Sequence, residues 1–212
     1  MAGDKTVFEY HPVTSDRWPD LDRLFSASSD ERLGNPSRCW CMEWRLPHEQ
    51  WQQQQGEGNR RAMEAFVASG DVPGILAYDG AEPVGWCSVS PRTSLPGLVQ
   101  TGNFENPDNP DVWAIVCFYV AETQRGRGLA KGLLQAAVQY AIAGGAKIVE
   151  AYPLSLPVLS GRAGDKTASE RSGLSADQIA DLLAGGSVRI FADAGFVEAG
   201  RVSEHQVVTR YY

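Results

Sequence analysis

The chain has 212 residues, of which 43% are hydrophobic and 21% are charged, as in an ordinary soluble globular protein. Its length suits one sizeable domain rather than two, so we expect residues 1–212 to form a single domain. The formal net charge of −7 argues against binding to nucleic acid, whose phosphates attract basic surfaces, and against binding to an anionic membrane.

The N-terminal residues contain no apolar segment typical of a secretory signal, and no apolar run reaches the ~20 residues that span a bilayer. These features favour a cytoplasmic protein whose cysteines are reduced thiols. Cys39 and Cys41 have no second pair at metal-binding spacing, and the three histidines are scattered along the chain. We therefore expect no metal site.

The N-terminal half predicts short strands and helices in alternation. In order, the sequence predicts a strand over residues 7–13, a helix over 18–28, a loop over 35–41, one or two helices over 47–69, and strands over 74–78 and 83–90. Asp79-Gly80 is a hairpin turn signal between the last two strands. Residues 91–111 are rich in turn formers and predict a long irregular connection.

The second half has clearer patterns. Residues 112–120 form a nearly continuous β-prone run, typical of a strand that is covered on both faces. Residues 129–143 predict a helix that ends at Gly144-Gly145, because apolar residues recur there at three- and four-residue spacing. These apolar residues are Leu129, Leu133, Leu134, Ala137, Val138, Ala141 and Ile142.

A strand over residues 147–152 follows this helix. Residues 160–186 are polar and contain glycine, as in an insertion, and Ser175 with Gln178 could cap a small helix inside it. A short helix over 187–194 and a hairpin of residues 196–201 and 205–211 complete the chain. The insertion is either a tolerated surface segment or a lid that leads into the last helix.

Two glycines lie in the turn between the β-prone run and the long helix, in the segment QRGRGLA of residues 124–130. Glycines let a ligand approach the main chain, and the helix adds unpaired N–H groups and the positive end of its dipole. The turn therefore predicts a phosphate or pyrophosphate site, although a tight turn with a solvated basic rim would look the same. A P-loop is excluded by its spacing, and a dinucleotide fingerprint by Lys131 at the third glycine position.

The same segment resembles the acetyl-CoA signature of the GNAT superfamily (Gcn5-related N-acetyltransferases). That signature is Arg or Gln, two residues, Gly, one residue, then Gly or Ala, and Arg125, Gly128 and Ala130 fill it. The chain is similar in particular to bacterial members with a Cys-Trp-Cys-Met element, here residues 39–42, and a Glu-Ala-Tyr-Pro strand end, here 150–153. The motif region that supports the resemblance covers residues 112–196.

The resemblance implies an α/β fold of the α+β type, with a twisted, mostly antiparallel mixed sheet whose central strands splay apart and which is flanked by helices. Acetyl-CoA would lie in the splay as co-substrate. A backbone N–H near Tyr119 would polarise the thioester carbonyl. The residues implied to bind the cofactor are Phe118, Tyr119, Val120, Arg125, Gly126, Arg127, Gly128, Leu129 and Ala130.

The chain departs from the family where proton transfer is concerned. Many members have a carboxylate base where this chain has Ala114, and a tyrosine acid where it has Phe191. Glu150 and Tyr152 are the replacement candidates, since two residues apart on a strand they share one face. Alternatively, Glu150 is a solvated edge carboxylate and Tyr152 a core aromatic.

The sequence thus favours direct transfer of acetyl from acetyl-CoA to the amine of a small-molecule acceptor. Two alternatives remain: an acetyltransferase for a protein or peptide amine, and a non-catalytic acyl-CoA-binding module that has lost its acid and base. A thiol in an apolar strand is more often a packing residue than a nucleophile, and this applies to Cys117. The chain is expected to be a monomer or a homodimer.

Overall fold

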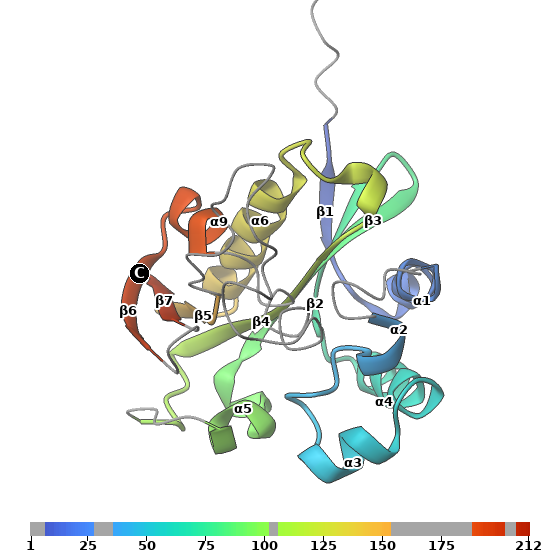
Figure 1. The fold of residues 1–212 in the computed structure, drawn as a ribbon, viewed down its shortest axis with the longest axis horizontal. Coiled ribbons are helices and arrows are strands. Elements are labelled where there is room, and N and C mark those ends of the chain that lie inside the picture. The colour runs from blue at the N-terminus through green and yellow to red at the C-terminus, as the bar shows by residue number, and fades with distance from the viewer. Residues whose placement is uncertain (1–6, 28–35, 102–105, 154–187, 202–206) are drawn as a thin grey trace, which may run out of the picture.

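The computed structural model describes residues 7–27, 36–101, 106–153, 188–201 and 207–212. One open sheet of seven strands runs through it in the order β1-β2-β3-β4-β5-β7-β6 (Figure 1). All neighbouring strands are antiparallel except β4 and β5, which are parallel. The strands are β1 Glu9–Pro12, β2 Gly74–Asp79, β3 Glu82–Pro91, β4 Val112–Val120, β5 Ile148–Ala151, β6 Val197–Arg201 and β7 Val207–Tyr211. The predicted mixed, mostly antiparallel sheet is confirmed.

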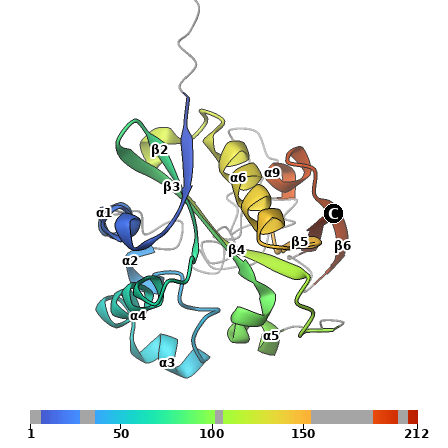
Figure 2. The same cartoon turned by 180° about the vertical axis from the view of Figure 1, so that it is seen from behind.

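Helices cover both faces of this sheet (Figures 1 and 2). The α-helices are α1 Trp18–Ser26, α2 Pro36–Cys39, α3 His48–Gln53, α4 Glu57–Ala68, α5 Pro96–Thr101, α6 Leu129–Ala143 and α9 Val188–Asp193. The described residues also form three short 3-10 helices, η1 Ser15–Arg17, η3 Arg92–Ser94 and η4 Glu122–Gln124. Buried residues of α6 and α9 share one core cluster with alternate residues of the strands, while α1 and α4 pack with the other set of β2 and β3 residues. None of the helices among the described residues has both the length and the apolar character to cross a membrane.

The hairpin of β2 and β3 has the turn that the sequence predicts. The two-residue connection begins at Gly80, whose φ of +62° lies in the left-handed region that glycine adopts without strain. Both strands are buried along almost their whole length, because helices cover both of their faces. The hairpin therefore forms the centre of the N-terminal half of the sheet.

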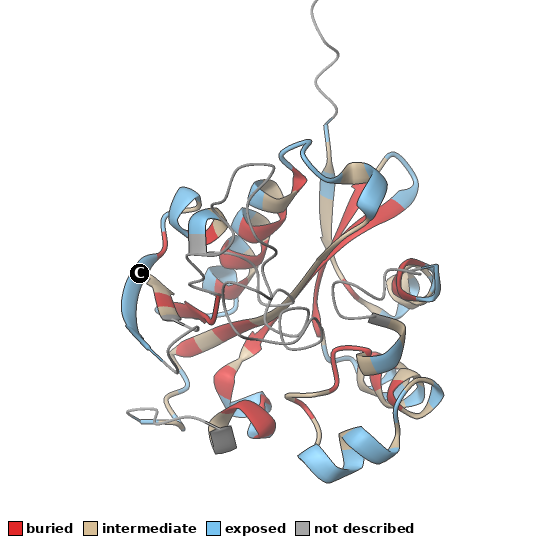
Figure 3. Cartoon of the chain, in the orientation of Figure 1, coloured by how far each residue is buried: buried red, intermediate tan, exposed pale blue. Residues whose placement is uncertain are grey.

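Helix α6 begins and ends where its apolar pattern predicts, from Leu129 to Ala143. Its leucine, valine and alanine stripe is buried against β2, β3 and β4, which yields the largest of the core clusters (Figure 3). Ile142 also fits the three- and four-residue spacing, but it is 44% exposed and does not belong to the core. Ile142 lies in the last turn of the helix, next to its final residue Ala143.

Strand β4 is covered on both faces only over its first half. Residues 113–115 pair with β3 on one side and with β5 on the other, Val112 pairs with β5, and three of these four residues are buried. Beyond Ile115 the strand keeps β3 as its partner, whereas its pairing with β5 ends. Residues 116–120 are only half-buried as a result, so the sequence pattern overestimated how far the strand is covered.

Two connections contain helices that the sequence did not predict. Helix α2 lies in the expected loop over 35–41, and η3 and α5 lie in the turn-rich stretch over 91–111. Pro36 and Pro96 each open one of these helices, where the missing N–H of proline is unimportant. The expected insertion over residues 160–186, including Ser175 and Gln178, lies outside the described residues. The final helix and hairpin are present as α9, β6 and β7.

Gly74 provides a test of the packing between β2 and β3. A Cβ atom at this position would lie 2.2 Å from the carbonyl oxygen of Cys87 and 2.7 Å from the ring of the fully buried Trp86. We expect Gly74→Ala to lower the free energy of unfolding by about 1–3 kcal/mol, because the two strands must separate locally. Urea denaturation measures this change.

Gly200→Ala is the matched control, since a Cβ at this strand glycine meets nothing within 4 Å. This variant should change the free energy of unfolding by no more than about 0.5 kcal/mol. Equal stability of the two variants would contradict the close contact of β2 with β3 at Gly74.

Candidate functional site

The turn before α6 has the backbone geometry of an anion site. Gly126 and Gly128 have φ angles of +77° and +82°, and Gly128 is the N-cap residue of α6. No side chain caps this helix end, and its first turn contains no acidic residue. A Cβ on either glycine would meet nothing within 4 Å, so the main chain is open to an approaching group. Free N–H groups and the helix dipole at such an end suit a phosphate.

The two arginines of this turn fix it to the neighbouring strands. Arg127 forms an ion pair with Asp79 at the end of β2, at 3.0 Å, and its guanidinium lies over the ring of Phe8. Arg125 donates from Nε to the carbonyl oxygen of Val120, 3.2 Å away. Both arginines are exposed, so they place positive charge at the edge of the turn. The main chain around the two glycines forms the anion site itself.

The C-terminal half of β4 has a free edge. Ile115 and Ala151 are the last residues that β4 and β5 pair, and beyond them β3 is the only strand among the described residues that pairs with β4. Ser88 pairs with Cys117 and Val89 with Ile115, so Val116 is the extra residue of a β-bulge at the point where the two strands part. Main-chain groups along this edge can pair with an extended ligand as an added strand would.

The bulge also reverses which side chains of β4 face each side of the sheet. Phe118 and Val120 pack toward the α6 cluster, whereas Cys117 and Tyr119 pack toward the cluster of α1 and α4. Tyr119 is half-buried, and its ring meets that of Phe25 edge-on at a centroid distance of 6.4 Å. The three residues that the sequence places along the cofactor therefore lie on the free edge, with Tyr119 directed away from α6.

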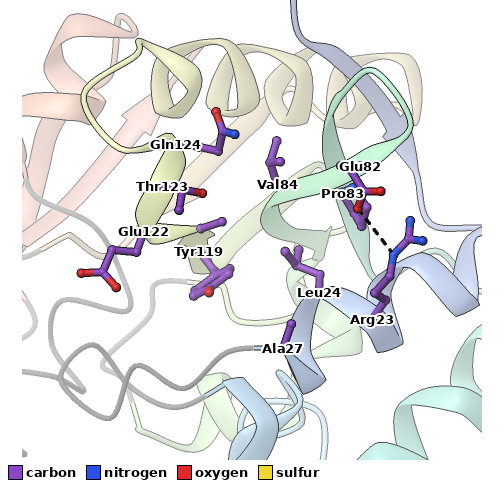
Figure 4. Close-up of a pocket in the computed structure, with 11 residues that line it drawn as sticks. Arg23, Leu24, Ala27, Glu82, Pro83, Val84, Tyr119, Glu122, Thr123 and Gln124 are labelled. Atoms are coloured by element: carbon purple, nitrogen blue, oxygen red, sulfur yellow. Dashed lines mark ion pairs between the residues drawn. The ribbon is translucent and has the colours of Figure 1, made fainter.

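A pocket of about 420 Å³ opens beside this end of β4, between α1 and η4 (Figure 4). Tyr119 forms part of its wall, and Glu122 of η4 lies at its edge. Arg23 and Glu82 form an ion pair across the opposite side, at 4.0 Å. The lining residues are Arg23, Leu24, Ala27, Glu82, Pro83, Val84, Tyr119, Ala121, Glu122, Thr123 and Gln124.

Glu150 lies at the centre of a buried ionic network. Its Oε2 accepts from Arg92 Nη1 at 2.8 Å and from the Tyr152 hydroxyl at 2.9 Å, and its Oε1 accepts from Arg210 Nε at 2.8 Å. The Glu150 side chain is 0% exposed. The alternative of a solvated edge carboxylate is therefore wrong, because β7 pairs with β5 on the side that the sequence left open.

Tyr152 lies next to Glu150 on the same face, as the spacing predicts. Its hydroxyl donates to Glu150, and burial raises the pKa of this hydroxyl above its ordinary value, with a further contribution from the Glu150 charge. A raised pKa makes the phenol a weaker acid. The two usual acid and base positions of the resemblance are also buried: Ala114 packs with Tyr152 and Leu95, and Phe191 packs edge-on against Phe196.

The cysteines of the Cys-Trp-Cys element form a cluster with the central strands. All four cysteines lie among the described residues, and none of them forms a disulfide. The Cys39 thiol is hydrogen-bonded to that of Cys41, Cys41 to Cys117, and Trp86 donates to Cys41 Sγ at 3.0 Å. Burial raises the pKa of the Cys41 thiol well above its usual value. A neutral, packed thiol is a poor nucleophile, which agrees with a packing role for this cluster.

Three buried or half-buried arginines of the site had no signal in the sequence. Arg92 and Arg210 come from η3 and β7, 58 and 60 residues away from their partner Glu150. Arg45 lies on the turn after α2 and reaches the serines of β3. The role of each arginine becomes visible only through its contacts with distant segments. Each one is a single arginine within a local sequence that has no motif.

Comparisons with known proteins agree with this geometry. The family model described as acetyltransferase (GNAT) family matches residues 22–155, more than half of the chain. No curated protein matches the chain.

Solved structures share the fold at low identity. A GNAT-family acetyltransferase from Streptococcus pneumoniae is 11% identical, covers 97% of this chain and 99% of its own, and has a TM-score of 0.52. The ribosomal-protein-alanine N-acetyltransferase from Brucella melitensis is 14% identical, with 96% and 98% covered and a TM-score of 0.51. The ribosomal-protein-S5-alanine acetyltransferase from Vibrio fischeri is 9% identical, with 100% and 94% covered and a TM-score of 0.52.

The family match, the open mixed sheet with its parting strands and the glycine turn before α6 lead to one conclusion: the chain belongs to the GNAT family of acetyltransferases.

Proposed function

We propose that this protein transfers an acetyl group from acetyl-CoA to the amine of a small molecule. The observation that carries the proposal is the combination of a free β4 edge with an uncapped helix end that follows it directly in the chain. The edge offers main-chain partners to an extended pantetheine arm, and the helix end offers N–H groups to a pyrophosphate.

The residues proposed to hold acetyl-CoA lie along this path. Tyr119 and its two neighbours Phe118 and Val120 supply the strand edge, and the segment from Arg125 to Ala130 supplies the turn and the first helical N–H groups. Arg125 and Arg127 add positive charge at the rim. Their ties to Val120 and Asp79 hold the turn in place before a ligand arrives.

Acetyl-CoA supplies an activated thioester, and transfer breaks its acyl–sulfur bond and forms an acyl–nitrogen bond. The amine must lose a proton before it attacks, and the sulfur gains one. The protein's part is to orient both groups and to present an N–H to the carbonyl oxygen. We propose that the N–H groups beside the bulge and Tyr119 take this last role, because they lie on the free edge at the parting of β4 and β5.

The pocket beside Tyr119 supports a small acceptor. A volume of about 420 Å³ suits a small molecule. The charged residues that line the pocket are the carboxylates Glu82 and Glu122 and the cation Arg23. The net negative charge favours a protonated amine at the entrance. Two structural neighbours are named for ribosomal-protein alanine, but at 14% identity or less they support only the fold, and a protein acceptor stays the second candidate.

Glu150 and Tyr152 remain the proposed catalytic pair, with separate roles. Both oxygens of Glu150 already accept hydrogen bonds, and its side chain is fully buried, so its contacts favour a positioning role. Tyr152 is the member that could approach substrate, held in one orientation by Glu150. A non-catalytic acyl-CoA-binding module is the alternative, since Ala114 and Phe191 cannot transfer protons.

The first prediction concerns cofactor binding. CoA should raise the melting temperature of the wild-type protein, because a ligand that binds only the native state stabilises it. Gly128→Val should abolish this shift, since a branched side chain would fill the open approach to the helix N–H groups. A thermal shift titration with CoA measures both effects.

Gly145→Val is the matched control. Gly145 also has a positive φ, +98°, and open space around its Cβ position, but it lies beyond the opposite end of α6. The backbone strain is therefore similar, and the CoA shift should remain. A normal CoA shift in Gly128→Val would place the phosphates elsewhere.

The second prediction concerns the buried pair. Tyr152→Phe should lower kcat by about ten- to a thousandfold, the usual span for positioned acid–base groups. The KM for acetyl-CoA should change little, because this hydroxyl is hydrogen-bonded to Glu150 and Tyr152 follows β5, whereas the phosphate turn precedes α6. Tyr140→Phe is the control. It also removes a phenolic hydroxyl, but from α6 on the other face of the sheet, and it should keep the wild-type kcat. Wild-type kcat in Tyr152→Phe would remove Tyr152 from the mechanism.

The third prediction separates stability from activity at Glu150. Glu150→Gln should lower kcat as well, and it should also lower the free energy of unfolding by about 3–5 kcal/mol, because the buried Arg92 then loses its countercharge. Combining it with Arg92→Met should restore part of that stability. Urea denaturation of the single and double variants measures the coupling; strictly additive losses would contradict a direct Arg92–Glu150 interaction.

A further inference from the structure

Acetyl transfer requires a group that takes a proton from the attacking amine, and neither the usual position nor Glu150 supplies one. Ala114 stands where many family members have a carboxylate. The side chain of Glu150 is 0% exposed, and its two oxygens already accept hydrogen bonds from two arginines and a tyrosine. Protonation of Glu150 would leave the buried Arg92 without its countercharge, which is unfavourable. The base is therefore a different group, and it has to be a side chain that the acceptor can reach.

The pocket beside Tyr119 narrows the choice. Among the described residues that line it, four have titratable side chains: Arg23, Glu82, Tyr119 and Glu122. Arginine and tyrosine side chains normally keep their protons near neutral pH, which leaves the two carboxylates. Glu82 lies on the side of Arg23, whose Nε is 4.0 Å from Glu82 Oε2, whereas Glu122 lies on the side of Tyr119 (Figure 4).

Glu122 combines an exposed side chain with a fixed backbone. Within the described part of the chain it takes part in no ion pair. The N–H of the preceding Ala121 donates to the carbonyl oxygen of Val84 at 2.9 Å, and the N–H of Arg125 donates to the carbonyl oxygen of Glu122 at 3.3 Å. The carboxylate is therefore attached to a fixed point of the pocket wall, while the side chain itself can turn toward a substrate.

The same residue is near the atoms that are proposed to react. Glu122 follows Tyr119 by three residues, and a main-chain N–H beside Tyr119 is the proposed partner of the thioester carbonyl. Three residues of fully extended chain span about 10 Å, and the chain turns into η4 after Ala121, so the two backbones are closer than that. The length of a glutamate side chain, or one ordered water molecule, bridges such a separation.

We infer that Glu122 is a catalytic residue of the transfer, which takes the proton that the amine loses on attack, directly or through one water molecule. This inference rests on the proposed function and assigns the base of the same site. It also gives the negative charge of the pocket a second use, because a carboxylate stabilises the positive charge that develops on the attacking nitrogen.

The step balances without a further group. The neutral form of the amine attacks the thioester carbon, and the new bond makes the nitrogen positive and its protons more acidic. Glu122 takes one of these protons. The carbon–sulfur bond then breaks, and the sulfur leaves as a thiolate that takes a proton from the protonated Glu122 or from water. An amine and acetyl-CoA have then become an amide and CoA, and the carboxylate is restored.

The test follows the release of CoA thiol by the wild-type protein at saturating acetyl-CoA, with a panel of small primary amines. If none of these amines reacts, hydrolysis of acetyl-CoA is measured instead, because an attacking water molecule also has to lose a proton. We expect Glu122→Gln to lower kcat by about a hundredfold. The KM for acetyl-CoA should not rise, because this change removes a negative charge three residues before the phosphate turn and no contact with the cofactor.

Two further variants separate proton transfer from a structural role. Glu122→Asp keeps a carboxylate and should retain more activity than Glu122→Gln. Glu122→Ala leaves space for a small carboxylate from solution, so formate should raise its kcat by at least about threefold and leave that of the wild type unchanged. Equal losses in Glu122→Asp and Glu122→Gln, together with no effect of formate on Glu122→Ala, would assign Glu122 a structural role and overturn the inference.

Glu49→Gln is the matched control. Glu49 is also an exposed glutamate in the first turn of a short helix, α3, but it does not line the pocket. This variant should keep the wild-type kcat. Both Glu49→Gln and Glu122→Gln should keep the wild-type melting temperature, because surface substitutions of this kind change stability little.

The remaining outcomes separate this inference from the proposed function. Wild-type kcat in Glu122→Gln, or a larger loss in Glu82→Gln than in Glu122→Gln, would overturn the role of Glu122 and leave the proposed function in place. A wild-type protein that turns over no acetyl-CoA, with or without a thermal response to CoA, would overturn the proposed function and this inference with it.

Discussion

The separation of β4 from β5 after Ile115 is the constraint on which the rest of the site depends. A strand in the middle of a sheet normally pairs on both sides, yet within the described part of the chain residues 116–120 pair only with β3. Buried main-chain groups need partners, so an edge of this kind suits a ligand that runs along it. The bulge at Val116 falls at the point of separation and turns Tyr119 to the face opposite α6. The edge, the pocket beside Tyr119 and the helix end at Gly128 then follow one another along the chain.

Charge is distributed unevenly over the face that carries the proposed acceptor site. Three arginines, Arg45, Arg92 and Arg210, lie on or beside it, whereas Glu150 is the carboxylate that two of them share. The network around Glu150 is internally balanced and ties η3, β5 and β7 together, so it explains how Tyr152 is held. Arg45, by contrast, donates to neutral oxygens of Pro73, Ser88 and Ser90.

Local patterns in the sequence predicted the elements well and the environment of single residues less well. Helix α6 and the hairpin at Gly80 depend on spacing and turn chemistry within a few residues, and both were confirmed. Local spacing could not predict the burial of Glu150, because the strand that covers that edge of β5 is β7, about 60 residues further along the chain. The contacts of Arg45 with the two serines of β3 were missed for the same reason. Only the pairing of distant strands, which no local pattern specifies, brings these charges together.

Amide hydrogen exchange with and without CoA tests the central claim most directly, because it reports on the main-chain groups that are proposed to bind. The free edge of β4 and the uncapped end of α6 predict that CoA slows exchange at Phe118, Tyr119 and Val120 and at the first N–H groups after Gly126. Exchange in β6, the edge strand beyond β7, should stay unchanged. Protection by CoA that leaves the β4 edge and the α6 turn unaffected would contradict the account.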